Sequence, residues 1–319
     1  MCGKTIRLSI AMVMAFAVAT FCCTDASTVA GEKRFIVGLE YSASSCNFCQ
    51  NFANVTKEYG EAAGLTVILT QGNRNVANQI TNAEAMLAQG AKVIGGFWDD
   101  TDACLPIATA CEEQGVWCIG VLTSLTNRAN GYDKYRFVGS ENYDGGYLQG
   151  EWAAKNLPEN AKIVYLRGLQ SDQQDQDRGR GFMEALEAGG RTDIKVLDTQ
   201  YSQNDRDKGL QIMENWIQAF PQIDGVVAFS DEVGCPAVVA LKSADRLDDT
   251  IVMSFDGSSE AQGLILKGEM AISVLQDYKA QAQAYIDLCI AIRDGAEVGD
   301  MKVPFTLITA ENVENYLDY

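Results

Sequence analysis

Polar and charged side chains follow several short runs of Val and Ile along the chain. In the first half, Ser45, Asn47 and Phe48 follow the first run, and Trp98 ends the third. The corresponding residues of the second half are Asp175, Gln176, Arg178, Asn204, Ser230, Asp231, Asp256 and Gln276. Each hydroxyl of a sugar or polyol both donates and accepts hydrogen bonds, and an apolar ring face can lie on an aromatic side chain. Together these side chains suit a small polyhydroxylated ligand, whereas a single Asp after a strand is more often a turn or helix cap.

An acceptor-rich cluster lies at residues 172–177, where Asp172, Asp175 and Asp177 alternate with glutamines. Carboxylates and amide oxygens in this number suit a polyol, an amino-bearing sugar or another cationic solute. A solvated loop that contacts no ligand explains the same residues equally well. The sequence leaves both interpretations open.

The sequence lacks the usual signatures of catalysis and of cofactor binding. It has no histidine, which removes the commonest general base and the commonest metal ligand. Asp99, Asp100 and Asp102 resemble part of a calcium loop, but the Glu that completes such a loop is missing. No glycine-rich dinucleotide or phosphate loop follows a strand. We therefore expect no cofactor and no metal, and a dinucleotide-dependent enzyme is a remote alternative.

The apolar runs alternate with stretches in which apolar residues recur every three or four positions, as in amphipathic helices. The predicted strands span residues 35–41, 65–71, 91–98, 116–122, 135–140, 161–168, 194–201, 225–231, 251–257 and 270–277. Strands that are apolar throughout and joined by helices pair in parallel, with helices on both faces of the sheet. A chain of 319 residues is long enough for two such α/β lobes. The polar residues then lie beyond the carboxyl ends of the strands, where open parallel sheets bind ligands.

The first residues have the order of a secretory signal: basic residues, an apolar run at 8–23 and then small residues. The run is shorter than the roughly 20 residues that span a bilayer, so a retained anchor is the weaker alternative. We expect residues 1–26 to be removed, with cleavage after Ala30 as the second option, and the mature chain to be periplasmic. Lipid attachment at Cys22 or Cys23 is disfavoured by the residues that precede them.

An odd number of cysteines remains after the signal, so at least one is unpaired. Export makes disulfides chemically possible. Cys46 and Cys49 form a lone C-x-x-C pair, for which a structural disulfide, buried free thiols and redox or metal chemistry are all open. A local bridge from Cys111 to Cys118 is plausible, and Cys104 could reach Cys46 or Cys49.

Five segments carry a resemblance to a known family. They are NYDGGYLQGEWAAKNL (142–157), DRGRGFMEAL (177–186), NDRDKGLQIMENWIQAFPQIDGVVAFSDE (204–232), VMSFDGS (252–258) and ISVLQD (272–277). In combination they resemble the type I periplasmic solute-binding proteins, especially the ribose and galactose branch, over nearly the whole mature chain. The resemblance implies a monomer whose chain crosses between two lobes near Gly139, Gln276 and Pro304. The implied lobes are residues 32–139 with 277–304, and residues 140–276 with 305–319.

The resemblance also implies ligand contacts at Phe48, Asp256 and Gln276, and less directly at Asp231. Trp98 would either cover the ligand or pack between the lobes. Arg178 would either tie its own loop to the lobe or contact the ligand.

Some positions depart from the ribose-binding pattern. Leu122 and Thr123 stand where the family usually has an Asp-Arg pair, Gln176 replaces an Arg, and Ser230 replaces an Asn. These changes remove cationic hydrogen-bond donors and therefore disfavour ribose as the ligand. Nucleosides, amino sugars and small furanoses remain open as ligands.

The leading functional hypothesis is a receptor that captures a monosaccharide or polyol and presents it to an ABC permease of the inner membrane, without breaking a bond. A sensory receptor for a sugar-like signal or a nucleoside, acting through a chemoreceptor, is the alternative. The formal net charge of −18 disfavours nucleic acid and anionic lipid as partners.

Overall fold

The computed structural model describes residues 34–42, 47–125 and 131–317. The chain divides into a short unit, Met1–Arg34, and a body, Phe35–Tyr319. The predicted signal, Ser45 and Cys46 lie outside the described residues. Within these ranges every helix is too short or too polar to span a bilayer.

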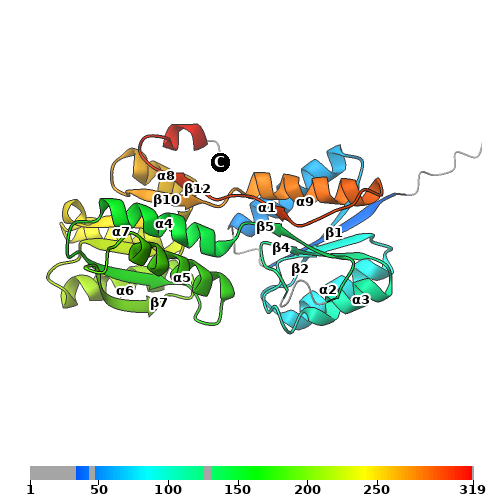
Figure 1. The fold of residues 1–319 in the computed structure, drawn as a ribbon, viewed down its shortest axis with the longest axis horizontal. Helices are drawn as coiled ribbons and strands as arrows, with labels where there is room; N and C mark the ends of the chain where they lie inside the picture. The colour runs from blue at the N-terminus through cyan, green and yellow to red at the C-terminus, as the bar shows by residue number, and fades with distance from the viewer. Residues whose placement is uncertain (1–33, 43–46, 126–130, 318–319) are drawn as a thin grey trace, which may run out of the picture. The chain divides into compact units, whose positions relative to one another are not determined.

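The first sheet of the body has six strands in the order β11-β5-β4-β3-β1-β2, all parallel. Figure 1 labels β1, β2, β4 and β5 of this sheet. The strands are β1 (Ile36–Tyr41), β2 (Thr66–Gln71), β3 (Val93–Gly96), β4 (Trp117–Val121), β5 (Tyr135–Gly139) and β11 (Met301–Lys302). Its helices are α1 (Asn47–Ala62), α2 (Val76–Ala88), α3 (Leu105–Glu113) and α9 (Tyr278–Arg293). Helices α1 and α9 share one buried cluster, and α2 and α3 share another. Helices therefore cover both faces, as predicted.

The second sheet has six strands in the order β12-β10-β9-β8-β6-β7. The strands are β6 (Lys162–Arg167), β7 (Lys195–Tyr201), β8 (Gly225–Ala228), β9 (Ile251–Asp256), β10 (Ile272–Leu275) and β12 (Thr306–Ile308), and only β12 is antiparallel to its neighbour. Its helices are α4 (Asn142–Asn156), α5 (Gln173–Ala188), α6 (Arg206–Ala219), α7 (Asp231–Ser243) and α8 (Ser259–Leu266). Short 3-10 turns follow at Leu247–Asp249 and Val313–Tyr316.

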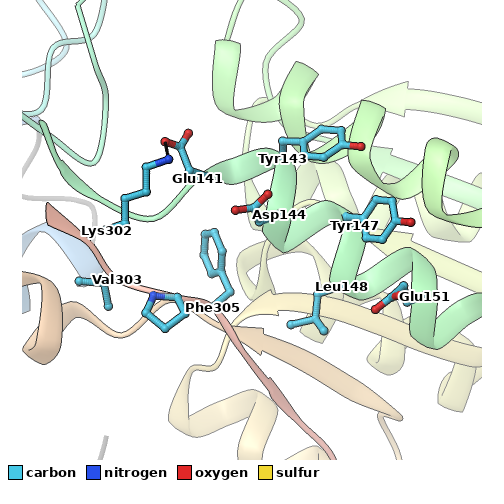
Figure 2. A pocket seen from close by; sticks show the side chains of 10 residues that line it. Glu141, Tyr143, Asp144, Tyr147, Leu148, Glu151, Lys302, Val303 and Phe305 are labelled. Atoms are coloured by element: carbon cyan, nitrogen blue, oxygen red, sulfur yellow. Dashed lines mark ion pairs between the residues drawn. The ribbon is translucent and has the colours of Figure 1, made fainter. Parts of the chain in front are cut away.

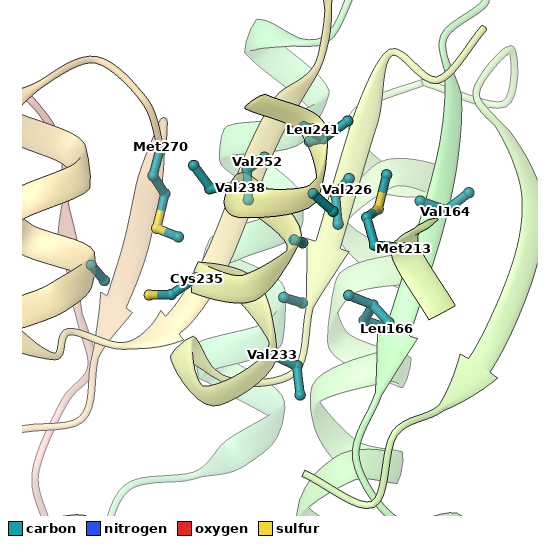
Figure 3. Packing of buried hydrophobic residues seen from close by; sticks show 14 of the residues in the cluster. Val164, Leu166, Met213, Val226, Val233, Cys235, Val238, Leu241, Val252 and Met270 are labelled. Atoms are coloured by element: carbon teal, nitrogen blue, oxygen red, sulfur yellow. The ribbon is translucent and has the colours of Figure 1, made fainter. Parts of the chain in front are cut away.

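The second sheet is also covered on both faces. Helices α4 and α5 bury Ala153 and Phe182 against one face. On the other face α6, α7 and α8 pack over the strands, and Figure 3 shows α7 lying across β8 and β9 with Val226 and Val252 in the cluster. The predicted class, two doubly wound α/β lobes, is confirmed. All predicted strands form, each within or near its predicted range.

The chain passes between the two sheets at three connections, from β5 to α4, from β10 to α9 and from β11 to β12. The Val303 N–H donates to Gly139 O at 2.9 Å. The Gln281 amide donates to Ser140 Oγ at 2.6 Å. Each connection is therefore fixed to another by a hydrogen bond.

The loop after β2 and the loop after β7 have the same local structure. Each contains two consecutive residues with positive φ, 55° and 55° at 73–74 and 61° and 55° at 203–204. Asn75 and Asp205 then cap the following helices by accepting a backbone N–H three residues on, at 3.2 and 2.9 Å. These turns carry the chain from the carboxyl end of a strand into a helix within a few residues.

The predicted bridge from Cys111 to Cys118 and the predicted bridge of Cys104 are wrong. Cys111 and Cys118 are both buried free thiols. They are close enough that a hydrogen bond with Cys111 is the main factor raising the pKa of Cys118, followed by burial. Cys104 is likewise a buried free thiol and forms no bridge to the first helix. Cys49 is disulfide-bonded, and its partner is none of the described cysteines.

Helices α4 and α5 approach each other through glycine. A Cβ on Gly146 would lie 2.0 Å from the carbonyl oxygen of Arg178, a backbone atom that cannot move aside alone. Gly263 in α8 is a matched contrast, because a Cβ there would meet nothing within 4 Å.

We predict that Gly146→Ala lowers the free energy of unfolding by about 2 kcal/mol or more, because overpacking forces the two helices apart. Gly263→Ala should leave it unchanged or raise it by roughly 0.5–1 kcal/mol, because alanine favours the helix. Urea unfolding of both variants measures this, and equal effects would contradict the close-packing account.

Candidate functional site

Arg178 lies at the centre of the carboxyl edge of the second sheet. The residue comes from α5 and is only 3% exposed. Its Nη2 donates to Gln276 Oε1 at 2.8 Å and its Nη1 to Phe229 O at 2.9 Å. Its Nε donates to Asn142 Oδ1 at 2.9 Å. One side chain therefore joins the start of α4 to the ends of β8 and β10.

Two aromatic rings flank the Arg178 guanidinium. Its central carbon lies 3.6 Å from the ring centroid of Phe255 and 4.6 Å from that of Phe229. Cation–π contacts of this kind contribute on the order of 1–2 kcal/mol when desolvated. Burial still lowers the pKa of Arg178 from its usual value, and nearby carboxylates, Asp256 first, oppose that shift.

Asp256 presents a partly exposed carboxylate at the same edge. Its oxygen lies 3.8 Å from Arg178 Nη1, too far for a hydrogen bond, and its side chain is 25% exposed. Burial raises the pKa of Asp256 to about 8; Arg178 opposes the shift, and Asp231 and Glu232 add to it. Its φ of 105° is a strained value for a residue other than glycine. The backbone thus holds an acceptor with spare hydrogen-bonding capacity at the end of β9.

Asp231 and Ser230 face inward. The Asp231 carboxylate accepts from the Ser258 N–H at 2.7 Å and from Ser273 Oγ at 2.9 Å, and the residue is 3% exposed. The buried Ser230 hydroxyl donates to Asn204 Oδ1. These contacts fix the loops after β7, β8 and β9, so the structure gives both residues a supporting position behind the edge.

The residues of the acidic cluster at the start of α5 have different environments in the structure. Asp175 is fully buried, with its carboxylate 2.7 Å from Arg167 Nη2 and 2.8 Å from the Gly168 N–H. This internal ion pair replaces the predicted ligand contact of Asp175. Gln176 is exposed, and its amide donates to Gln170 O at 3.0 Å within the same loop. Asp172 caps α5 by accepting from the Gln174 N–H at 2.9 Å.

The first sheet contributes fewer of the predicted residues. Phe48 is half-buried in the first turn of α1, with ring centroids 6.3 Å from Phe52 and 6.1 Å from Tyr278. Asn47 begins that helix. Trp98 is fully buried in the cluster of α2 and α3, where its ring lies over Gly96. The prediction that Trp98 covers the ligand is therefore replaced by a core position.

Arg74 links the two edges electrostatically. It is exposed on the loop after β2. Burial raises the pKa of Asp99 in the first lobe and of Asp172 in the second, and the positive charge of Arg74 opposes both shifts. Ser42 also donates to Asp99 Oδ1 at 2.8 Å. The charge of Arg74 therefore acts on one carboxylate of each lobe.

Glu40 is a buried carboxylate that the sequence analysis missed. It lies on β1 opposite Thr70, which donates to its Oε2 at 2.6 Å. Asn82 donates to the same oxygen at 2.9 Å, and a Cβ on Gly72 would lie 2.6 Å from the other oxygen. Burial raises the pKa of Glu40 to about 7, hydrogen bonds from Thr70 and Asn82 oppose this, and Asp99 adds to it. The carboxylate thus supports the loop after β2 from beneath.

Among the described residues, no group of three or more cysteine, aspartate or glutamate side chains is arranged to hold a metal ion. What the structure brings together at the edge of the second sheet is Arg178, Asp256 and Gln276. Such a set can bind hydroxyl groups through a carboxylate and an amide.

Comparisons with known proteins give one consistent result. Residues 37–297 match the family described as periplasmic binding protein domain. The ribose import binding protein of Salmonella typhimurium is 27% identical over 240 residues, 75% of this chain and 78% of that protein. A putative rhizopine-binding protein of Rhizobium meliloti is 26% identical over 304 residues, 89% and 98% of the two chains. A Bacillus halodurans ABC transporter solute-binding protein with bound myo-inositol superposes with a TM-score of 0.81 at 26% identity, over 90% and 99% of the chains.

We predict that Glu40→Gln stabilises the fold increasingly as the pH rises. The pKa of Glu40 is raised from 4.5 to about 7, so the stability that its neutral form provides is complete below about pH 4.5 and is lost by about pH 7. Glutamine stays neutral throughout, and its advantage over the native residue should grow by about 2 kcal/mol between pH 5.5 and 7.

Urea unfolding across this pH range measures the difference, with Glu84→Gln as the control. Glu84 is an exposed carboxylate of the neighbouring α2, so its removal should give a small difference that does not change with pH. A flat difference for Glu40→Gln would contradict the role assigned to burial.

Proposed function

Because the chain belongs to the periplasmic binding protein domain family, we propose that it captures a small polyhydroxylated solute, a monosaccharide or a polyol, and delivers it unchanged to a membrane transporter. The observation that carries the proposal is the buried Arg178–Gln276 pair beside a partly exposed Asp256. This arrangement fixes an acceptor with unused hydrogen-bonding capacity where open parallel sheets bind ligands.

The chemistry of these groups fits hydroxyl recognition. The Asp256 carboxyl accepts hydroxyl protons, and in its ionised form these hydrogen bonds are charge-assisted and contribute about 1.5–3 kcal/mol each. The Gln276 oxygen is taken by Arg178, which orients its amide NH₂ as a donor to a ligand oxygen. Phe48 supplies an aromatic face for the apolar side of a sugar ring. Donor, acceptor and apolar surface together match an alternating arrangement of hydroxyl and C–H groups.

The relatives support this ligand class. Their names and bound molecules include ribose and myo-inositol, a sugar and a polyol. Gln176, in place of the arginine that the ribose pattern has there, is exposed and bonded within its own loop. We therefore favour a hydroxylated ligand other than ribose, for which this arginine is not required.

Capture takes place between two lobes, residues 32–139 with 277–304 and residues 140–276 with 305–319. The ligand bridges their carboxyl edges and bending at the three connections buries it, after which the closed form docks on an ABC permease. Residues 1–26 act as the export signal, and the mature chain works as a periplasmic monomer.

The direct experiment is thermal unfolding of the mature, ligand-stripped chain with pentoses, hexoses, polyols, amino sugars and nucleosides. A ligand present at about a thousand times its dissociation constant adds about 4 kcal/mol and raises the midpoint by several degrees. A shift with a sugar or polyol is the expected result. A shift with nucleosides alone, or with nothing on the panel, would contradict the proposed ligand class.

We predict that at a pH above 8, where Asp256 is ionised, Asp256→Asn weakens binding of the stabilising sugar or polyol by roughly 10- to 100-fold, the loss of one or more charge-assisted hydrogen bonds. Asparagine tolerates positive φ, so the fold should persist. Asp248→Asn, an exposed change of the same charge, is the control and should bind normally. Calorimetric titration measures all three proteins, and equal affinities would exclude Asp256 as a ligand contact.

A further inference from the structure

A groove of about 770 Å³ lies between α4 and the connection from β11 to β12. Its size is in the range of small-molecule sites. Figure 2 shows Asp144 and Phe305 in the middle of the groove, with Glu141 and Lys302 at one end and Leu148 and Glu151 at the other. Arg178, Asp256 and Gln276 do not line it, so it is separate from the site described above.

The walls of the groove are held in place by packing on their far sides. Asp144, Leu148 and Glu151 follow one another at helical spacing on α4, and the opposite face of that helix buries Gly146 against α5. Phe305 packs edge-on against Phe255 with ring centroids 5.0 Å apart. A ligand therefore enters a preformed groove, and the entropic cost of ordering the groove on binding is small.

The charges that line the groove are unbalanced. Lys302 Nζ lies 3.1 Å from Glu141 Oε1, so its charge is matched. Asp144 and Glu151 are exposed, and among the described residues neither carboxylate has an ion pair or a hydrogen bond. Two uncompensated negative charges thus lie beside the apolar surfaces of Leu148 and Phe305.

One aromatic side chain of α4 already contacts a cation. Tyr143 and Tyr147 have ring centroids 5.9 Å apart. The guanidinium carbon of Arg180, which is not part of the groove, lies 4.7 Å from the Tyr143 centroid. Aromatic faces and carboxylates are the two kinds of group that attract an organic cation most strongly.

We propose that this groove is a second ligand site, which binds a small organic cation consisting of an ammonium or amidinium group on a flat apolar body. The cationic group lies between Asp144 and Glu151, and the apolar body lies against Leu148, Phe305 and Tyr147. The site is independent of the solute captured at the sheet edge.

The test is a titration of the ¹⁵N-labelled mature chain with phenethylammonium chloride, followed by amide NMR. We expect saturable shifts at residues 143–151 and 302–306, with a dissociation constant on the order of 1 mM. The neutral analogue 2-phenylethanol should bind about tenfold more weakly or not at all, because it lacks the charge.

The variant Asp144→Asn/Glu151→Gln should weaken phenethylammonium binding about tenfold. Glu187→Gln/Glu214→Gln removes the same charge from exposed helix positions elsewhere and should bind like the native chain. Unchanged thermal midpoints check that both variants are folded. Shifts absent from the groove, equal binding of 2-phenylethanol, or equal affinity of the two double variants would each overturn the proposal.

Discussion

The buried guanidinium of Arg178 is the interaction on which the candidate site depends. Its donors reach Asn142, the carbonyl of Phe229 and the amide of Gln276, which come from segments far apart in the chain. Removing a charge from water costs several kcal/mol unless hydrogen bonds and nearby charges offset the loss. Here three acceptors, two aromatic rings and one carboxylate supply that offset. The site therefore forms only when α5, the start of α4 and the ends of β8 and β10 have come together.

The polar residues of the second lobe divide into those that hold loops in place and those that face the proposed ligand. The polar atoms of Asp175, Asp231 and Ser230 form an ion pair and hydrogen bonds inside the lobe, and these contacts fix loops. Asp256, by contrast, keeps a partly exposed carboxylate at the edge, 3.8 Å from Arg178 Nη1. The same rigid core extends from Arg178 through Phe255 to Phe305, which forms a wall of the groove beside α4. The candidate site at the sheet edge and the groove thus share one packed framework while using different surfaces.

The fold could be predicted from the sequence because each strand and helix leaves a short-range pattern of apolar residues in it. Apolar runs separated by amphipathic stretches specify parallel strands and crossover helices, whereas β11 and β12 are two and three residues long, too short to leave such a pattern. That Arg178, Asp256 and Gln276 lie near one another could be predicted because strand ends and the helix starts that follow them meet at one edge. Trp98, on a loop, and Asp175, in the first turn of α5, are both buried, which could not be predicted because the sequence does not tell which side of a loop or of a helix start turns inward. Glu40 was missed although a charged residue inside the apolar strand IVGLEY was a usable signal.

The most direct test of the account is NMR observation of the Arg178 side-chain Nε–H during titration with the sugar or polyol that stabilises the fold. If the ligand binds at the edge that Arg178 organises, this resonance and the amides of Asp256 and Gln276 shift together, saturating at the dissociation constant found by calorimetry. If the ligand saturates the protein while these resonances stay unchanged, the solute binds elsewhere and the site assigned here is wrong.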